Sequence, residues 1–146
     1  MATIKRTATA VWNGNFKSGD GRINTISGVL QETPYSFTTR FEGSPGTNPE
    51  ELLAASHAAC YSMAFALTLS NKGYQPTNIH TRAVCTLEPQ AGGGFKITKI
   101  RLETQGQIRD VDADNFQQMA REAEAVCVIS NALRQGVEIE LDASLA

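Results

Sequence analysis

The sequence predicts an α+β domain whose sheet is mostly antiparallel. Two observations carry this prediction. Short runs of β-branched and aromatic residues, bounded by turn residues, alternate with two longer stretches whose apolar residues recur at helical spacing. Their order along the chain is β-β-β-α-β-β-α-β. Because the 146 residues are enough for one hydrophobic core but not for two, we expect residues 1–146 to form a single domain.

The N-terminal part of the chain predicts a small antiparallel meander. Residues 7–12 mix β-branched, small and aromatic side chains and end at Asn13-Gly14, a dipeptide suited to a tight turn with positive φ. Further extended segments are expected over residues 21–27 and 35–41. The segment 42–47 contains two glycines and a proline and predicts the loop that closes the meander.

The strongest local signal is the start of a helix. Asn48 can act as the N-cap, Pro49 suits the first helical position, and Glu50 and Glu51 lie in the first turn, where the helix dipole favours anions. The following residues leave almost no polar face until Lys72-Gly73 supplies a stop. This pattern predicts a buried helix of about 23 residues, about 35 Å long.

A hairpin is expected after this helix. Residues 79–88 and 95–104 are rich in β-forming side chains, and a proline and three glycines lie in the segment 89–94 between them.

A second helical region follows the hairpin. Asp112 or Asp114 can cap it, and apolar residues recur at helical spacing up to Cys127 and then on to Gly136. Residues 137–141 alternate apolar and acidic side chains and predict a last strand.

Composition excludes several classes of function. With 13 basic and 15 acidic residues, the formal net charge is −2, which gives no electrostatic footprint for nucleic acid or anionic lipid. No charged-then-apolar leader is seen, and polar residues interrupt the longest apolar stretch, so we expect a soluble, unprocessed protein. Three cysteines are too few for a disulfide framework, which indicates the reducing cytoplasm.

Each candidate residue, taken alone, has an ordinary structural explanation. Cys60, in the middle of the apolar helix, could be a core cysteine, which without a nearby cation would be inert. Cys85 is expected to fill the core from a strand. His57, one turn before Cys60, could be half of a metal site or a base, but a hydrogen-bonded helix histidine is favoured. Arg40, expected on a strand, and Glu50, a first-turn acid, would both be unremarkable alone.

Taken together, these residues resemble the OsmC family of osmotically inducible hydroperoxide reductases. The resemblance is carried by the segments 34–43, 46–52 and 58–60, and is extended by Gly28-Val29-Leu30, by residues 97–100 and by a second cysteine on the late helix. It covers nearly the whole chain. The related organic hydroperoxide resistance proteins take their arginine from an earlier loop, so Thr38-Thr39-Arg40-Phe41 is similar to the OsmC subclass.

The resemblance implies a role for each residue of the motif. Cys60 would be the peroxidatic cysteine, Cys127 the resolving cysteine, Arg40 the group that keeps Cys60 ionised, and Glu50 the acid that holds Arg40. It also implies an OsmC-like fold with two long helices in an intertwined homodimer. No cofactor or metal is implied, only an external dithiol reductant such as one of the lipoyl type. One departure is Val128, where the family usually has proline.

The spacing of Glu50 and Cys60 independently indicates a dimer. Ten residues on one helix separate them by about 15 Å along its axis and about 80° around it, too far to share one site. Two such helices crossing antiparallel near Ala54 and Ala55 would bring Glu50 of one chain beside Cys60 of the other.

We expect an apolar substrate site. Its lining is expected from Phe37, Leu53, Tyr61 and Met63, which would favour alkyl or aryl hydroperoxides over hydrogen peroxide because burying the organic tail is favourable.

Three other functions stay open from the sequence. A metal- or ligand-binding dimer could use His57, Cys60 and Cys127 without turnover. A cysteine hydrolase or acyltransferase would need a histidine base, for which His57 and His80 are poorly placed. An inactive scaffold dimer is the third.

Overall fold

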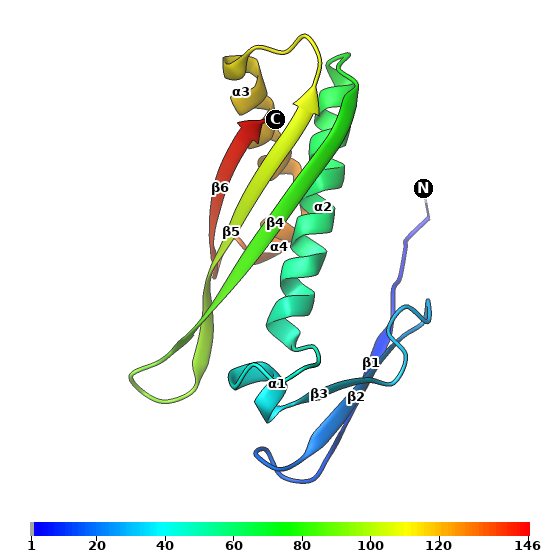
Figure 1. Cartoon of the computed structure of the whole chain (residues 1–146), viewed down its shortest axis with the longest axis vertical. Helices are drawn as coiled ribbons and strands as arrows, with labels where there is room; N and C mark the ends of the chain where they lie inside the picture. The colour runs from blue at the N-terminus through cyan, green and yellow to red at the C-terminus, as the bar shows by residue number, and fades with distance from the viewer. Residues whose placement is uncertain (1) are drawn as a thin grey trace. The chain divides into compact units, whose positions relative to one another are not determined.

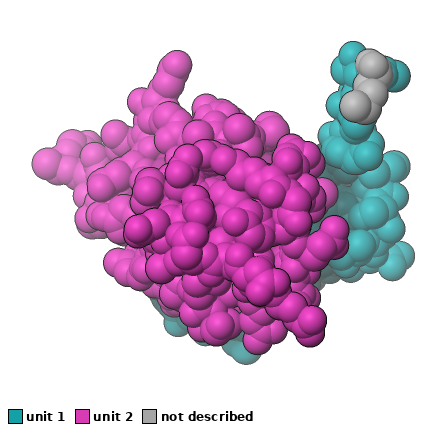
Figure 2. Space-filling model, turned by 90° about the horizontal axis from the view of Figure 1, so that it is seen from above, with its two compact units in different colours: residues 1–52 teal, residues 53–146 magenta. Residues whose placement is uncertain are grey.

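The computed structural model describes residues 2–146 and divides the chain into two compact units. Unit 1 comprises residues 1–52 and unit 2 comprises residues 53–146 (Figure 2). The boundary falls inside the long helix α2, Pro49–Asn71. Each unit has its own three-stranded sheet and helical segments, so the predicted α+β class is confirmed. That the whole chain acts as a single domain stays a prediction.

Unit 1 is built on the antiparallel meander that the sequence predicts. Strands β1 (Ala8–Asn13), β2 (Asp20–Thr25) and β3 (Thr33–Ser36) lie in the order β1-β2-β3. In the register of this sheet, Gly21 faces Trp12 on one side and Tyr35 on the other. A Cβ at position 21 would collide with the Tyr35 ring, so only glycine allows this close packing.

The third strand is shorter than predicted, and Arg40 lies on a helix instead. Residues Phe37–Phe41 form the short helix α1, so the prediction of a strand over 35–41 is wrong beyond Ser36. The physical reason is a capping box: the Thr39 amide donates to Ser36 Oγ at 3.2 Å, and the Ser36 amide donates to Thr39 Oγ1 at 2.9 Å. These two hydrogen bonds outweigh the β-propensity of the aromatic and threonine side chains.

Helix α2 begins and ends as predicted. The Glu51 amide donates to Oδ1 of the N-cap Asn48 at 2.8 Å, and the helix runs for 23 residues. Gly73, with φ +85°, follows its end.

The expectation that α2 is buried on all sides is wrong for the single chain. A stripe at every fourth position, formed by His57, Tyr61, Phe65 and Leu69, is fully buried. Met63 and Leu67, however, are 75% and 59% exposed. By length and composition alone α2 could also cross a membrane, a test that the core helices of soluble proteins pass as well, so this is weak support for a membrane span.

In unit 2 the remaining helices cover one face of a mixed sheet. Strands β4 (Pro76–Pro89) and β5 (Phe95–Ile108) form the predicted hairpin, and β6 (Glu138–Leu145) pairs with β5 in parallel. Helices α3 (Ala113–Val126) and α4 (Val128–Leu133) lie behind this sheet in Figure 1. Asp112 caps α3: its side chain accepts from the Asn115 amide at 2.9 Å.

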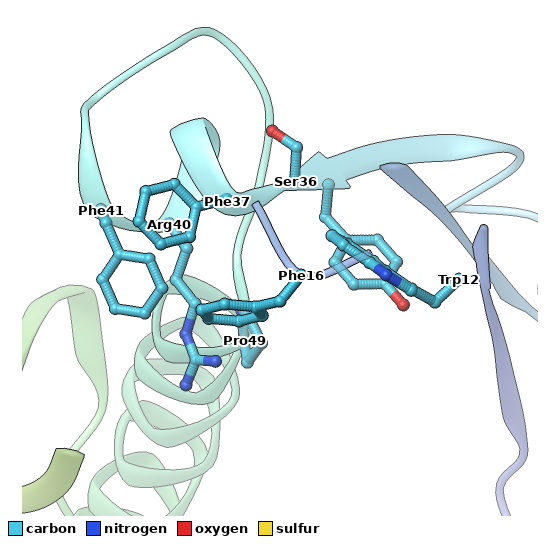
Figure 3. A pocket seen from close by; sticks show the side chains of 8 residues that line it. Trp12, Phe16, Ser36, Phe37, Arg40, Phe41 and Pro49 are labelled. Carbon is cyan, nitrogen blue, oxygen red and sulfur yellow. The ribbon is translucent and has the colours of Figure 1, made fainter. Parts of the chain in front are cut away.

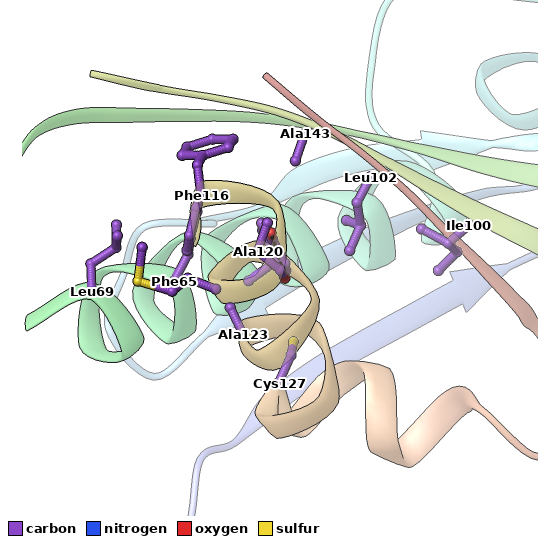
Figure 4. Close-up of a cluster of buried hydrophobic side chains, with 11 residues drawn as sticks. Phe65, Leu69, Ile100, Leu102, Phe116, Ala120, Ala123, Cys127 and Ala143 are labelled. Carbon is purple, nitrogen blue, oxygen red and sulfur yellow. Dashed lines mark hydrogen bonds between the residues drawn. The ribbon is translucent and has the colours of Figure 1, made fainter. Parts of the chain in front are cut away.

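The core of unit 2 positions Cys127. Aromatic and aliphatic side chains from α2, α3 and the sheet are buried together (Figure 4), namely Tyr61, Phe65, Leu69, Ile100, Leu102, Phe116, Met119, Ala120, Ala123, Cys127 and Ala143. The predicted helical region is interrupted at Cys127, whose backbone is extended with φ −63° and ψ 119°. The break between α3 and α4 thus forms with Val128 in the place of the proline that the family usually has.

Candidate active site

Unit 1 holds Arg40 in a two-point ion pair. Arg40 Nε lies 3.1 Å from Glu50 Oε2, and Arg40 Nη2 lies 2.6 Å from Glu50 Oε1. The Glu50 side chain is only 12% exposed, so the carboxylate is held in place while part of the guanidinium stays open to solvent. The capping box of α1 and the N-cap of α2 set the positions of the two side chains. The structure therefore brings together the arginine and the acid that the resemblance pairs.

An aromatic pocket of about 280 Å³ surrounds this arginine in unit 1 (Figure 3). Its walls are mainly aromatic rings, supplied by Trp12, Phe16, Tyr35, Phe37 and Phe41, with Ser36 and Pro49 completing the lining. The rings of Phe16 and Phe37 meet edge to face at 5.3 Å, and the Arg40 Cζ lies 5.1 Å from the centre of the Phe41 ring. The site therefore combines a fixed cation with an apolar wall, which suits a small molecule with an organic tail and a polar end.

Phe37 is the one predicted substrate-binding residue in this pocket. The other four aromatic residues of the pocket, Trp12, Phe16, Tyr35 and Phe41, were not predicted from the sequence. A signal for Phe41 was available, because in a helix Phe37, Arg40 and Phe41 share one face at spacings of three and four residues.

In unit 2 the two predicted redox cysteines are in contact. The thiol of Cys127 donates to the sulfur of Cys60, with the two sulfurs 3.4 Å apart. Cys60 is partly exposed in the middle of α2. Cys127 is fully buried among the side chains of the core (Figure 4). Residues 67 positions apart are thus placed where a small movement would allow a disulfide, whose sulfur–sulfur length is about 2.05 Å.

The surroundings of Cys127 favour its protonated form. Burial raises the pKa of the Cys127 thiol, and the neighbouring Cys60 raises it further, while hydrogen bonding from the backbone and side chain of Ser130 lowers it. Cys127 is therefore suited to act second, after a more exposed sulfur has reacted.

His57 occupies the structural position that the sequence favoured. Its Nε2 lies 2.7 Å from Ser130 Oγ, and both side chains are fully buried, so the hydrogen-bonded helix histidine is confirmed. Burial lowers the pKa of His57, Glu124 raises it and Arg134 lowers it. The role of Ser130 was not predicted from the sequence, because no local pattern relates it to His57, 73 positions earlier.

The other predicted substrate-binding residues lie in unit 2. Tyr61 is fully buried and its hydroxyl donates to the Ala120 carbonyl at 3.1 Å, which makes it part of the core in this unit. Met63 is largely exposed and borders an open surface groove with Ile79. Leu53 packs at the margin of the core, as does Cys85.

The metal-binding alternative gains no support. Within residues 2–146, no three or more His, Cys, Asp or Glu side chains are grouped so that they could hold a metal ion. His57 and Cys127 instead share Ser130 as a neighbour.

Comparisons with known proteins identify the family of this chain. Residues 41–142 match the family model described as OsmC-like protein. The chain is 46% identical over 143 residues to peroxiredoxin OsmC of Escherichia coli (strain K12), with 98% of each chain covered. It is 29% identical over 122 residues to organic hydroperoxide resistance protein OhrB of Bacillus subtilis (strain 168), with 84% of this chain and 88% of OhrB covered.

Solved structures are similar in fold. The crystal structure of Bacillus subtilis OhrB has a TM-score of 0.75 and 27% identity, and covers 94% of this chain and 97% of that one. An organic hydroperoxide resistance protein OsmC from Legionella pneumophila has a TM-score of 0.80 at 24% identity, with 99% of each chain covered, which is a likeness of fold. The family model spans most of the chain and the identity to a relative is high over nearly its full length. The chain therefore belongs to the OsmC-like protein family.

Proposed function

We propose that this protein is a thiol-dependent peroxidase that reduces organic hydroperoxides to alcohols. The observation that carries the proposal is the contact of 3.4 Å between the sulfurs of Cys60 and Cys127 in unit 2. The similarity to a peroxiredoxin and to organic hydroperoxide resistance proteins supports the same chemistry.

The proposed reaction has two steps on the protein. The Cys60 thiolate attacks the distal oxygen of the hydroperoxide, the O–O bond breaks, and an alcohol leaves while Cys60 becomes a sulfenic acid. Cys127 then attacks the Cys60 sulfur, which gives a disulfide and water. An external dithiol restores both thiols. We propose a lipoyl-type or other small dithiol for this role, acting in the cytoplasm on an enzyme with no bound cofactor.

Arg40 is proposed to activate the thiol and the peroxide. A guanidinium group stays charged at neutral pH, so it can stabilise a nearby thiolate and donate hydrogen bonds to the leaving oxygen as negative charge develops there. Glu50, through its two hydrogen bonds of 3.1 and 2.6 Å, would keep the guanidinium from turning away.

We propose that the complete site forms between two copies of the chain. Helix α2 is continuous from Pro49 to Asn71, so Glu50 and Cys60, ten residues apart, are separated by about 15 Å along its axis. Two copies of α2 crossing at Ala54 and Ala55 would bring the Arg40–Glu50 pair of one chain to Cys60 of the other. The small side chains at the crossing and the exposed Met63 and Leu67 support this arrangement.

Intact mass spectrometry tests the function. We expect fully reduced protein treated with one equivalent of cumene hydroperoxide to lose two hydrogens, and peptide mapping to place the new disulfide between Cys60 and Cys127. The Cys127→Ser variant is the matched control and should stop at a Cys60 sulfenic acid. A stable sulfenic acid on Cys60 of the wild-type protein would show that Cys127 is not the resolving cysteine. If Cys60 is not oxidised at all, the proposed function is wrong.

Selectivity is a second prediction. Because an apolar tail can be buried against the aromatic rings around Arg40, kcat/KM for cumene hydroperoxide should exceed that for hydrogen peroxide by at least about 10-fold. Phe37→Ala should lower this ratio, mainly through a higher KM for the organic substrate, whereas Phe95→Ala, an exposed aromatic in unit 2, should leave it unchanged. Equal efficiency with both peroxides in the wild-type enzyme would contradict the proposal.

A further inference from the structure

A buried polar pair links the two segments of unit 2 that carry Cys60 and Cys127. His57 lies three residues before Cys60 on α2, and Ser130 lies three residues after Cys127 on α4. The His57 Nε2 and the Ser130 Oγ are 2.7 Å apart, and both residues are fully buried. Buried polar groups of this kind are costly unless they are hydrogen-bonded, and the proposed peroxidase chemistry so far uses neither of them.

The second nitrogen of His57 fixes the direction of this hydrogen bond. The Nδ1 atom is buried and has no hydrogen-bond partner within residues 2–146. Burial also lowers the pKa of His57, so the ring is neutral at pH 7 and carries one proton. A buried N–H without an acceptor costs more than a bare nitrogen without a donor, so the proton belongs on Nε2. His57 therefore donates to Ser130 Oγ.

This direction leaves the Ser130 hydroxyl proton available for Cys127. A serine hydroxyl has one proton, and once its oxygen accepts from His57 that proton can be donated elsewhere. Hydrogen bonding from the Ser130 amide and hydroxyl lowers the pKa of Cys127, against the burial that raises it. Ser130, three residues after the N-cap Cys127 of α4 and buried with it, is thus held by His57 next to the Cys127 sulfur.

The contact between the Cys60 and Cys127 sulfurs changes when Cys60 is oxidised. With both cysteines reduced, the Cys127 thiol donates its proton to the Cys60 sulfur across 3.4 Å, and Cys60 raises the pKa of Cys127. In the proposed mechanism Cys60 is a thiolate before it reacts, so its oxidation to a sulfenic acid removes a negative charge beside this proton. From then on the hydrogen bonds from Ser130 favour ionisation of Cys127 without opposition from Cys60.

From this geometry we infer that Ser130 is a catalytic residue of the resolving step and that His57 is the positioning residue that aims its hydroxyl at Cys127. As the Cys127 proton leaves, Ser130 donates a hydrogen bond to the developing thiolate. The thiolate electron pair forms the S–S bond, the S–O bond of the Cys60 sulfenic acid breaks, and the departing hydroxide takes up a proton to become water. Cys127 is oxidised and Cys60 is reduced, so the step needs no further reactant. This inference rests on the proposed function.

Three other groups bear on the titration of this cluster. Glu124 and Arg134 act on His57 in opposite directions and are paired with each other at 2.8 Å, so their effects partly cancel. Burial raises the pKa of Tyr61 well above its ordinary value, and its hydroxyl is bound to the Ala120 carbonyl, so Tyr61 stays neutral throughout the working range.

The test follows the two steps separately in the full-length protein. Reduced wild type and Ser130→Ala are mixed with one equivalent of cumene hydroperoxide, quenched at intervals with dimedone, which labels sulfenic acids, and analysed by mass spectrometry. Ser130→Ala should form the Cys60 sulfenic acid at the wild-type rate but close the disulfide at least about 10-fold more slowly, because a hydrogen bond to a charged group is lost. The pH midpoint of disulfide closure should move upwards, an effect that looser packing alone would not produce.

Matched variants separate the possible outcomes. His57→Leu should slow closure in the same direction, His57→Gln, which retains an N–H donor, should restore most of the rate, and the exposed Ser70→Ala should match wild type. Disulfide closure in Ser130→Ala with the wild-type rate and pH midpoint would overturn the inference and leave the proposed function intact. If circular dichroism shows that Ser130→Ala does not fold, the His57 variants decide. Equal rates of disulfide closure in His57→Leu and His57→Gln would then overturn the inference. If the wild-type protein itself forms no disulfide, both the inference about Ser130 and the proposed function are overturned.

Discussion

Replacement of Cys60 by serine should reduce kcat/KM for cumene hydroperoxide by at least about 10³-fold, because removing an attacking nucleophile eliminates the reaction path itself. A serine hydroxyl is almost identical in size but is protonated at neutral pH, so it cannot attack the O–O bond. The rate is measured as consumption of the hydroperoxide with a dithiol reductant in excess.

Two further cysteine variants sharpen this prediction. Cys85→Ser should retain most of the activity, because Cys85 lies at the margin of the core on β4. Cys127→Ser should still consume one equivalent of peroxide before it stalls. Substantial steady-state activity in Cys60→Ser would show that another group attacks the peroxide.

Replacement of Arg40 by methionine should lower kcat/KM by about 10²–10³-fold, the usual effect of removing one donor that stabilises a developing negative charge. Methionine keeps much of the length and apolar surface of the arginine but loses the charge and both hydrogen bonds to Glu50. Arg40→Lys should recover only part of the loss, because an ammonium group cannot make the two-point contact. The control Arg82→Met removes an exposed arginine of unit 2 and should leave the rate unchanged.

Mixing two inactive variants tests whether the site is composite. In the proposed dimer, a hybrid of Cys60→Ser and Arg40→Met subunits contains one site with both an intact Cys60 and an intact Arg40. Random exchange of subunits should therefore restore about a quarter of the wild-type activity, since half of the dimers are hybrids and each has one good site. If all the residues of a site came from one chain, mixing would restore nothing.

Local signals in the sequence were sufficient for much of the fold. The start of α2 was predictable because Asn48, Pro49, Glu50 and Glu51 each act on their own helix turn. The hairpin was predictable for a similar reason, since its turn residues lie between two β-rich runs. The short helix α1 was missed because its β-forming side chains outweighed a capping box at Ser36 and Thr39 whose signal is two residues long.

The residues of the site were predictable only where a sequence motif or a helical periodicity indicated them. Arg40, Glu50, Cys60 and Cys127 came from the resemblance, and the structure joins them into two pairs. Tyr61 was expected at the substrate, although its four-residue spacing from His57 and Phe65 already placed it on the buried face of α2. The partnership of His57 with Ser130 could not be predicted, because it arises only when α4 packs beside α2 across 73 residues of sequence.

If Arg40 keeps the sulfur of Cys60 ionised, the rate at which Cys60 is alkylated should depend on Arg40. In a Cys85→Ser, Cys127→Ser background, the iodoacetamide reaction at Cys60 is followed by mass spectrometry across a pH series. We expect a rapid reaction whose rate is independent of pH around neutrality. When Arg40→Met is added, the reaction should become slow and its rate should rise with pH. A thiol that alkylates slowly at neutral pH with Arg40 intact, or identically in both proteins, would contradict it.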